Sequence, residues 1–372
     1  MTFKEAMEHY RAGTASEQER QLVEQELEKS QLIAEYLDEQ WDEKAFVPIA
    51  PTEEIKQVRK TLRRRNILIV LTSLALSAAL LLGAVYIGIP AAEGLYWDPT
   101  AASYAAPHIT DLELMLAAYT ELFCPDINIS SATASKIGFG TYDISIRYWN
   151  AYRGGDSMFA NGTVEKSELC LPAGFLSYCP VNIFDRATYP FFPVREGHLE
   201  NIHAELAELP DYLTIVAAVS FPEDKNMEEV LAFQDSLIDG QVGWTAIRTG
   251  PLDEQILPLC GMNVFQWGSV REAANGAYPC FDTKPVEITP ENLEMHFKSL
   301  LRFSADQSRN GTGIPEEYRM GRCYYTDALN YVEENGIYSY GCYVCGTPET
   351  LLALIDSGAV SQIWIEDIWI SI

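Results

Sequence analysis

The residues of this chain with the clearest chemical potential are its eight cysteines. An even set of cysteines confined to one part of a chain is typical of disulfides formed in an oxidising compartment. Eight cysteines allow many pairings, so their spacing alone does not assign partners. The disulfide candidates are Cys124, Cys170, Cys179, Cys260, Cys280, Cys323, Cys342 and Cys345.

Cys342 and Cys345 form a CxxC motif, a spacing that is used in redox sites and zinc sites. The motif lies in a strand-like run, and no helix opens on it, which disfavours a redox active site. No histidine lies near these cysteines in the sequence, which disfavours zinc. The pattern therefore favours a structural disulfide role.

The histidines and carboxylates show no catalytic pattern. His198 and His203 are close in sequence, but their five-residue separation does not match a ligand motif, so surface positions are expected for them and for His108 and His296. The chain lacks the serine-nucleophile motif G-x-S-x-G, the zinc-binding motif H-E-x-x-H and the phosphate-binding motif G-x-x-x-x-G-K-[ST]. We expect no catalytic residue, no metal and no cofactor, and hence a protein that is not an enzyme.

A long apolar run divides the chain into an N-terminal part and a larger C-terminal part, and the cysteines all lie in the second part. Ile67–Ile89 contains 23 residues and no charge. As a helix with a rise of about 1.5 Å per residue it is about 34 Å long, which is enough to cross a hydrocarbon core of about 30 Å. A segment in lipid must satisfy its own backbone groups. The sequence therefore predicts a transmembrane helix over residues 66–89.

The distribution of charge predicts the orientation of this helix. Arg63, Arg64 and Arg65 directly precede the apolar run, and no Lys or Arg follows it before Lys136. This asymmetry predicts a single-pass protein of the cell membrane with a cytoplasmic N-terminus and an extracellular C-terminus. Residues 1–65 carry a net charge of −3 and the remainder −24, so direct nucleic-acid binding is excluded as a function.

Residues 1–65 read as a cytosolic helical module followed by a linker. A first helix is expected to end at Gly13, and Ser16 with Glu19 forms a capping box for a second. A third helix is predicted to begin near Ser30. Such a small module gains order by packing its apolar faces on a partner, or, as the alternative, on each other. The candidate partner-binding residues are Phe3, Met7, Tyr10, Leu22, Val23, Leu27, Ile33 and Leu37.

The exported part reads as α+β, with an α/β segment at 93–205 and a sensor domain at 206–372. Two stretches of the second domain share the order strand, helix, strand, and each ends in an aromatic-rich strand, around Trp244 and around Trp364. These paired βαβ-like units predict a ferredoxin-like core with helices on one sheet face. Glu93–Pro107 is Ala-rich and is expected to be exposed and flexible.

A family resemblance adds to these patterns. Tyr10-x-x-Gly13, followed by SEQERQLVEQELEKSQLIAEYLDE, resembles the sigma-binding domain of membrane-bound anti-sigma factors. The zinc-binding members have His and two Cys where this chain has Glu26, Ser30 and Ile33. The resemblance is therefore to the zinc-free branch in Gram-positive bacteria, which has sigma factor regulator N-terminal and C-terminal domains. The strand, Ser-Phe, helix and Trp-x-Ala order of residues 209–250 resembles that C-terminal domain.

This resemblance implies a transmembrane anti-sigma factor. Its cytosolic helices would sequester an extracytoplasmic-function (ECF-type) sigma factor, and its extracellular sensor domain would control release. The implied partner is the sigma factor, and the apolar run adds the lipid bilayer. Release could use an envelope protease, for which the exposed segment Glu93–Pro107 offers a cutting site. The alternative is a single-pass envelope receptor or structural protein with a ligand-binding ectodomain and no transcriptional role.

Overall fold

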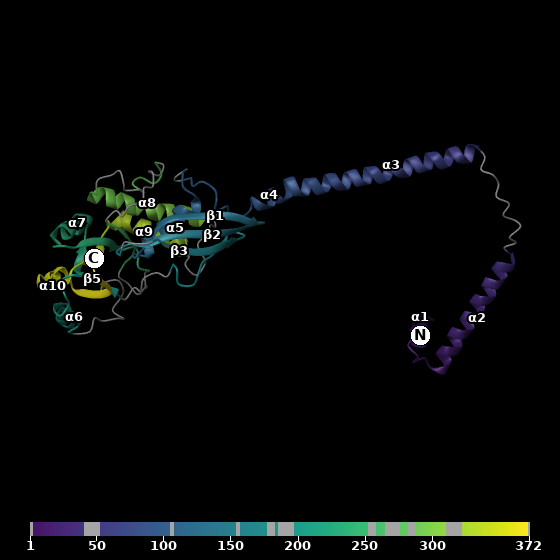
Figure 1. The fold of residues 1–372 in the computed structure, drawn as a ribbon, viewed down its shortest axis with the longest axis horizontal. Helices are drawn as coiled ribbons and strands as arrows, with labels where there is room; N and C mark the ends of the chain where they lie inside the picture. The colour runs from purple at the N-terminus through teal and green to yellow at the C-terminus, as the bar shows by residue number, and fades with distance from the viewer. Residues whose placement is uncertain are drawn as a thin grey trace. The chain divides into compact units, whose positions relative to one another are not determined.

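The computed structural model describes residues 3–40, 53–104, 108–153, 157–176, 183–184, 197–251, 258–264, 276–281, 288–309 and 322–370. The chain forms two compact units, Met1–Gly83 and Ala84–Ile372. Its elements are shown in Figure 1. Cys179 lies outside the described residues, as do Pro48 and Pro51 of the linker predicted within residues 1–65.

The first unit begins with two helices that pack on each other, α1 (Phe3–Arg11) and α2 (Glu17–Gln40). The prediction of a third helix near Ser30 is wrong, because α2 continues through this residue. The Ser30 hydroxyl donates to the carbonyl of Leu27, one turn back, instead of capping a new helix. The residues around it are mostly Glu, Gln, Leu and Lys, which favour an unbroken helix.

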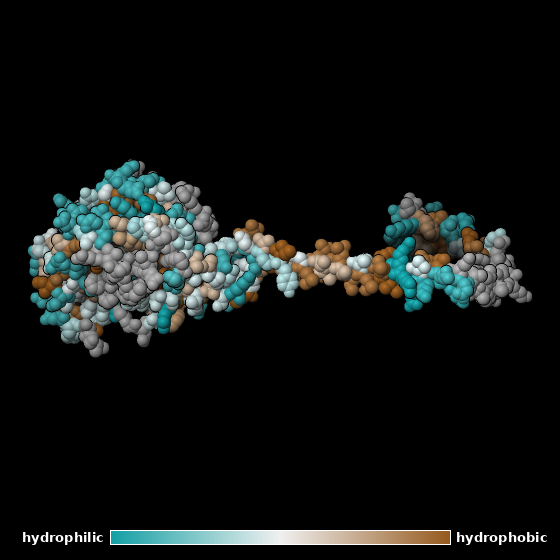
Figure 2. All heavy atoms as spheres, turned by 90° about the horizontal axis from the view of Figure 1, so that it is seen from above, coloured by the Kyte–Doolittle hydropathy of each residue, from teal (hydrophilic) through white to brown (hydrophobic). Residues whose placement is uncertain are grey.

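A long helical segment follows. It consists of α3 (Glu53–Gly83), one π-helical turn, η2 (Ala84–Gly88), and α4 (Ile89–Glu93). Lys56–Glu93 is long and apolar enough to cross a membrane, and its most apolar window is not buried by any described part of the protein. Figure 2 shows hydrophobic residues gathered along this segment. The segment contains the predicted span at 66–89.

The second unit opens with a four-stranded antiparallel sheet in the order β1-β2-β3-β4. Helix α5 (Asp111–Phe123) lies against β1, and its N-terminus is capped by the Thr110 hydroxyl. Tyr142, Ile144 and Ile146 alternate along β2 and are buried, as their spacing predicts. The strands are β1 (Ile127–Gly138), β2 (Thr141–Asn150), β3 (Met158–Glu165) and β4 (Glu168–Cys170).

The described part of Glu93–Pro107 contacts this sheet, while Leu95 and Tyr104 within it are exposed as expected. The backbone N–H of Trp97 donates to Ser167 Oγ at 2.7 Å, and the Trp97 ring packs on the core. Further along, the N–H of Ser103 donates to the carbonyl of Ile109 at 2.7 Å. Sequence reasoning missed these contacts because their partners come from later in the chain.

A five-stranded antiparallel sheet forms the C-terminal part, in the order β7-β6-β8-β5-β9. The two predicted strand–helix–strand units are present, as β5-α7-β6 and β8-α10-β9. They interleave, because β8 lies between β5 and β6 while β5 lies between β8 and β9. The elements are α6 (His198–Ala207), β5 (Leu213–Lys225), α7 (Met227–Ser236), β6 (Gln241–Ile247), β7 (Gly261–Asn263), α8 (Pro290–Arg309), α9 (Arg322–Asn335), β8 (Ser339–Gly346), α10 (Pro348–Asp356) and β9 (Gln362–Ile370).

The two faces of this sheet are covered differently. Ala217 and Val219 of β5 belong to a core that includes apolar residues of α7, α8 and α10. Val216 and Ala218 point to the other face, where Trp244, Tyr340 and Tyr343 form a second, aromatic-rich cluster. The sheet is thus buried on both sides, and the described helices contribute to the first side.

Candidate partner-binding surface

The contact between α1 and α2 is small. Ala6 and Val23 are fully buried, and Met7 and Tyr10 are half-buried. With so few buried side chains, this helix pair has little hydrophobic stabilisation of its own. Val23, one of the predicted partner-binding residues, therefore supports the packing of the pair and is not presented at its surface.

A polar network fixes the turn between the two helices. The Ser16 N–H donates to Glu19 Oε2 at 2.7 Å, and the Glu19 N–H donates to Ser16 Oγ at 3.4 Å, which confirms the predicted capping box. His9 Nδ1 of α1 lies 2.9 Å from Glu19 Oε1. The hydrogen bond from Ser16 and the contact with His9 lower the pKa of Glu19 from its ordinary 4.5 to about 2.

This network predicts an acid-sensitive helix pair. The pKa of Glu19 is lower in the folded state than in the unfolded state, so its stabilisation is complete above about pH 4.5 and is lost as the pH falls towards 2. We expect residues 1–65 to lose helicity over this range, measured by circular dichroism. Glu19→Gln should remove this component of the pH dependence. If helicity falls with pH in the same way in the original protein and in Glu19→Gln, Glu19 is not the group responsible.

The remaining apolar side chains of α2 are exposed. Leu32, Ile33, Tyr36 and Leu37 occupy positions i, i+1, i+4 and i+5 and therefore lie on one side of the helix. Leu27 is exposed one and a half turns earlier. A charged helix that presents large apolar side chains to solvent is typical of a surface that a partner covers. The exposed fractions are Phe3 45%, Leu22 37%, Leu27 42%, Leu32 60%, Ile33 60%, Tyr36 61% and Leu37 54%.

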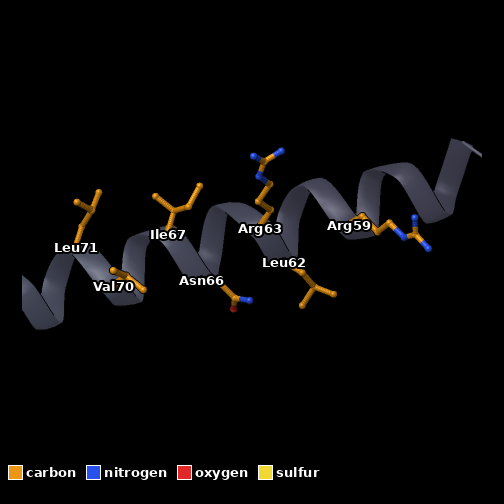
Figure 3. Close-up of a pocket in the computed structure, with 7 residues that line it drawn as sticks. All are labelled: Arg59, Leu62, Arg63, Asn66, Ile67, Val70 and Leu71. Carbon is orange, nitrogen blue, oxygen red and sulfur yellow. The ribbon is translucent and has the colours of Figure 1, made fainter.

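Ordered basic residues separate this surface from the apolar helix. Arg63, Arg64 and Arg65 are exposed in α3, directly before the apolar run. Figure 3 shows Arg59 and Arg63 projecting from the helix one to two turns before Ile67. This is the pattern of a helix that passes from a charged interface into a hydrocarbon layer.

The predicted disulfides are not supported, because no disulfide joins any of the described cysteines. Cys179 and the side chain of Cys323 lie outside the described residues. Cys260 and Cys342 are fully buried, and burial raises the pKa of Cys260 to about 12 and also raises the pKa of Cys342. Such cysteines behave as small apolar core residues.

The geometry of β8 also excludes a bridge within the CxxC motif. Cys342 and Cys345 are three positions apart in an extended strand, which separates their Cα atoms by about 10 Å, beyond the limit of about 7 Å for a disulfide. An odd separation also sends the two side chains to opposite faces of the sheet, and indeed Cys342 belongs to one core cluster while Cys345 packs on the other.

One histidine does not lie at the surface as expected. His296 of α8 is 3% exposed, and its Nε2 lies 2.8 Å from Glu121 Oε1 of α5. Its Nδ1 lies 2.8 Å from the carbonyl oxygen of Cys280. Both ring nitrogens are therefore engaged, so His296 ties two helices together. The signal that could have found it is its spacing from Leu293, Phe297 and Leu300, which places it on the buried face of α8.

The five-stranded domain also has an open hollow of about 450 Å³ at one end of its sheet. Its polar groups include Asp211 and Asp239 from loops and the Cys345 thiol, whose pKa burial raises to about 11. A thiol with this pKa is protonated at neutral pH and is a poor nucleophile. Within the described residues, no group of three His, Cys, Asp or Glu side chains could hold a metal ion.

Comparison with known proteins agrees with part of the sequence reading. Residues 206–367 match the model of the family described as sigma factor regulator C-terminal, and this range covers the five-stranded sheet up to β9. Neither the search of curated proteins nor the search of solved structures found a match. Together with the apolar helix Lys56–Glu93, the match suggests a membrane-anchored protein. The match covers less than half of the chain, and it supports a sigma factor regulator family for residues 206–367.

Proposed function

We propose that this protein is a transmembrane anti-sigma factor that holds an ECF-type sigma factor through the exposed apolar side of α2. The sigma factor regulator C-terminal match suggests an anti-sigma role and implies a sigma factor partner. The observation that carries the proposal is the row of large apolar side chains that α2 exposes, including Ile33 and Leu37.

In the proposed complex the sigma factor covers this row of side chains. Full burial of a large apolar side chain is worth about 1.5–3 kcal/mol, so Leu32, Ile33 and Leu37 together could supply most of the energy of a micromolar complex. The contact of α2 with α1 does not use these side chains, since they are more than half exposed. A helix laid into an apolar groove of a partner would cover them.

We also propose an orientation of the chain in the membrane and a separate role for each of the two units. Arg63, Arg64 and Arg65 support a cytoplasmic α1–α2 pair and an extracellular second unit. We assign the sensor role to the five-stranded domain, and the match of residues 206–367 to the regulator family supports this assignment. The interleaved strand order of that domain supports a ferredoxin-like core. Sensing by this domain would control release of the sigma factor from the other side of the membrane.

Co-purification tests the central claim. Residues 1–65, expressed without the apolar helix, should retain one ECF sigma factor of the source organism and silence transcription from its promoters. The second unit, expressed alone, should retain none. If residues 1–65 retain no sigma factor while their helicity is normal, the proposal is wrong.

The alternative, an envelope receptor without a transcriptional role, has one observation in its favour. The hollow lined by Asp211, Asp239 and Cys345 is large enough for a small polar ligand. The two functions differ in what they require of α2. The receptor alternative predicts that charge substitutions at Phe3, Met7, Leu27 and Leu37 leave transcription unchanged, whereas the anti-sigma function predicts constitutive sigma activity.

A further inference from the structure

The turn of the β1–β2 hairpin carries apolar side chains where polar ones are usual. Between Lys136 and Thr141 the chain runs Ile137, Gly138, Phe139 and Gly140, which we call the hairpin tip. Ile137 is 58% exposed and Phe139 42% exposed. Hairpin turns favour Asn, Asp and Gly, and exposed apolar groups at such a point indicate a contact surface.

The hairpin tip is held against the chain that leaves the apolar helix. Lys136 Nζ donates to Glu93 Oε2 at 2.6 Å, and this hydrogen bond raises the pKa of Lys136. The Tyr96 ring meets the Phe139 ring edge-on, with 5.8 Å between their centroids. The hairpin tip and α4, which carries Glu93, therefore belong to one compact unit, Ala84–Ile372.

The depth of this contact follows from helix geometry. Ile89 is the last residue of the apolar run, and Glu93 ends α4 four residues later. Four residues of helix rise about 6 Å. The polar layer of a bilayer extends about 5–8 Å beyond the hydrocarbon core on each side. Glu93 and its partner Lys136 therefore lie at the level of the lipid headgroups.

We propose that the hairpin tip is a membrane-contact site, at which Ile137 and Phe139 enter the interfacial layer of the bilayer that the apolar helix spans. The Tyr96 ring packs on Phe139, and the next residue back along the chain, Leu95, is 83% exposed. Aromatic and apolar side chains settle in this layer. This inference uses one part of the proposed function, the membrane anchor, and it does not depend on sigma factor binding.

This contact would connect the bilayer to the five-stranded domain. At the other end of the four-stranded sheet, shortly after β2, Arg153 pairs with both carboxylate oxygens of Asp367 in β9. Its guanidinium group also lies over the Trp369 ring, 5.6 Å from the centroid. The four-stranded sheet would thus contact the headgroup layer at one end and the five-stranded domain, which matches the regulator family, at the other.

Photo-crosslinking of the full chain tests the site. The photoreactive p-benzoylphenylalanine replaces Phe139 in protein reconstituted into vesicles of phosphatidylethanolamine and phosphatidylglycerol, and phospholipid adducts are measured by mass spectrometry. The matched control carries the probe at Phe159, which is 63% exposed on β3. Phe159 pairs with Arg147, six strand positions or about 20 Å from Thr141 at the base of the tip.

We expect at least tenfold more lipid adduct from position 139 than from position 159. Equal yields, or no adduct at 139 in protein that floats with the vesicles, would overturn the membrane contact and leave the anchor intact. A chain that does not float would overturn both. Failure of residues 1–65 to retain a sigma factor, with a normal adduct at 139, would refute the proposed function alone.

Discussion

Replacing Ile33 and Leu37 of α2 by Asp should abolish sigma factor binding without unfolding the protein. Their side chains are 60% and 54% exposed, so the folded state loses little. In the proposed complex both are buried, and their loss should cost about 3–6 kcal/mol, or roughly 100- to 10,000-fold in affinity. The measurement is titration calorimetry of residues 1–65 with the purified sigma factor, together with a reporter for its promoters.

The control for this pair adds the same charge elsewhere on α2. Gln21 and Gln31 are both exposed, and Gln31 lies two residues before Ile33, on the other side of the helix at about 100° per residue. Gln21→Asp with Gln31→Asp should bind within a few-fold of the original protein. If both pairs weaken binding equally, net charge and not the apolar row determines the interaction.

Trp244→Ala should be the most damaging single substitution in the five-stranded domain. Trp244 is fully buried, its Nε1 donates to the carbonyl of Glu121 at 2.6 Å, and its ring meets Tyr343 edge-on. Truncation of a buried Trp typically costs about 3–5 kcal/mol, and a domain of this size loses about 2–4 °C in melting temperature per kcal/mol. We expect a decrease of about 10 °C, measured by differential scanning calorimetry of the purified protein.

Trp364 offers a matched control, because it lies in the same sheet but is 44% exposed. Trp364→Ala should lower the melting temperature by no more than about 3 °C, in line with a cost below about 1 kcal/mol for a surface change. Since the α1–α2 pair belongs to the other compact unit, neither substitution should change binding by residues 1–65. Equal effects of the two tryptophans would contradict the assigned burial.

Local patterns in the sequence predicted the local structure well. The apolar run became part of one helical segment, Ser16 and Glu19 formed the expected capping box, and Ile144 and Ile146 face the core. Each of these features depends on residues within one or two turns of each other, or on alternation along one strand. The same local reading failed at Ser30, whose hydroxyl can bond to a helix carbonyl as well as cap a new helix.

Contacts between segments far apart in the sequence determined where several key side chains lie. His296 meets Glu121 across 175 positions, and Trp97 meets Ser167 across 70. Gly243 marks an irregularity in β6, and the Tyr152 ring packs so closely against it that a Cβ there would clash. Because of this irregularity Val242 and Trp244 face opposite sides of the sheet. Hydrophobic periodicity in the sequence does not predict these contacts between distant residues.

By itself, then, the sequence determined the apolar helix, the capping box of the second helix before it and the strand–helix–strand units after it, because hydrophobic spacing and caps act over a few residues. Only the tertiary structure decided that Cys342 and Cys345 cannot bridge, that the segment after Glu93 is bound to a sheet, and that Phe139 lies beside Tyr96. Those outcomes depend on strand pairing and packing between segments far apart in the chain, which fix distances that no local pattern contains.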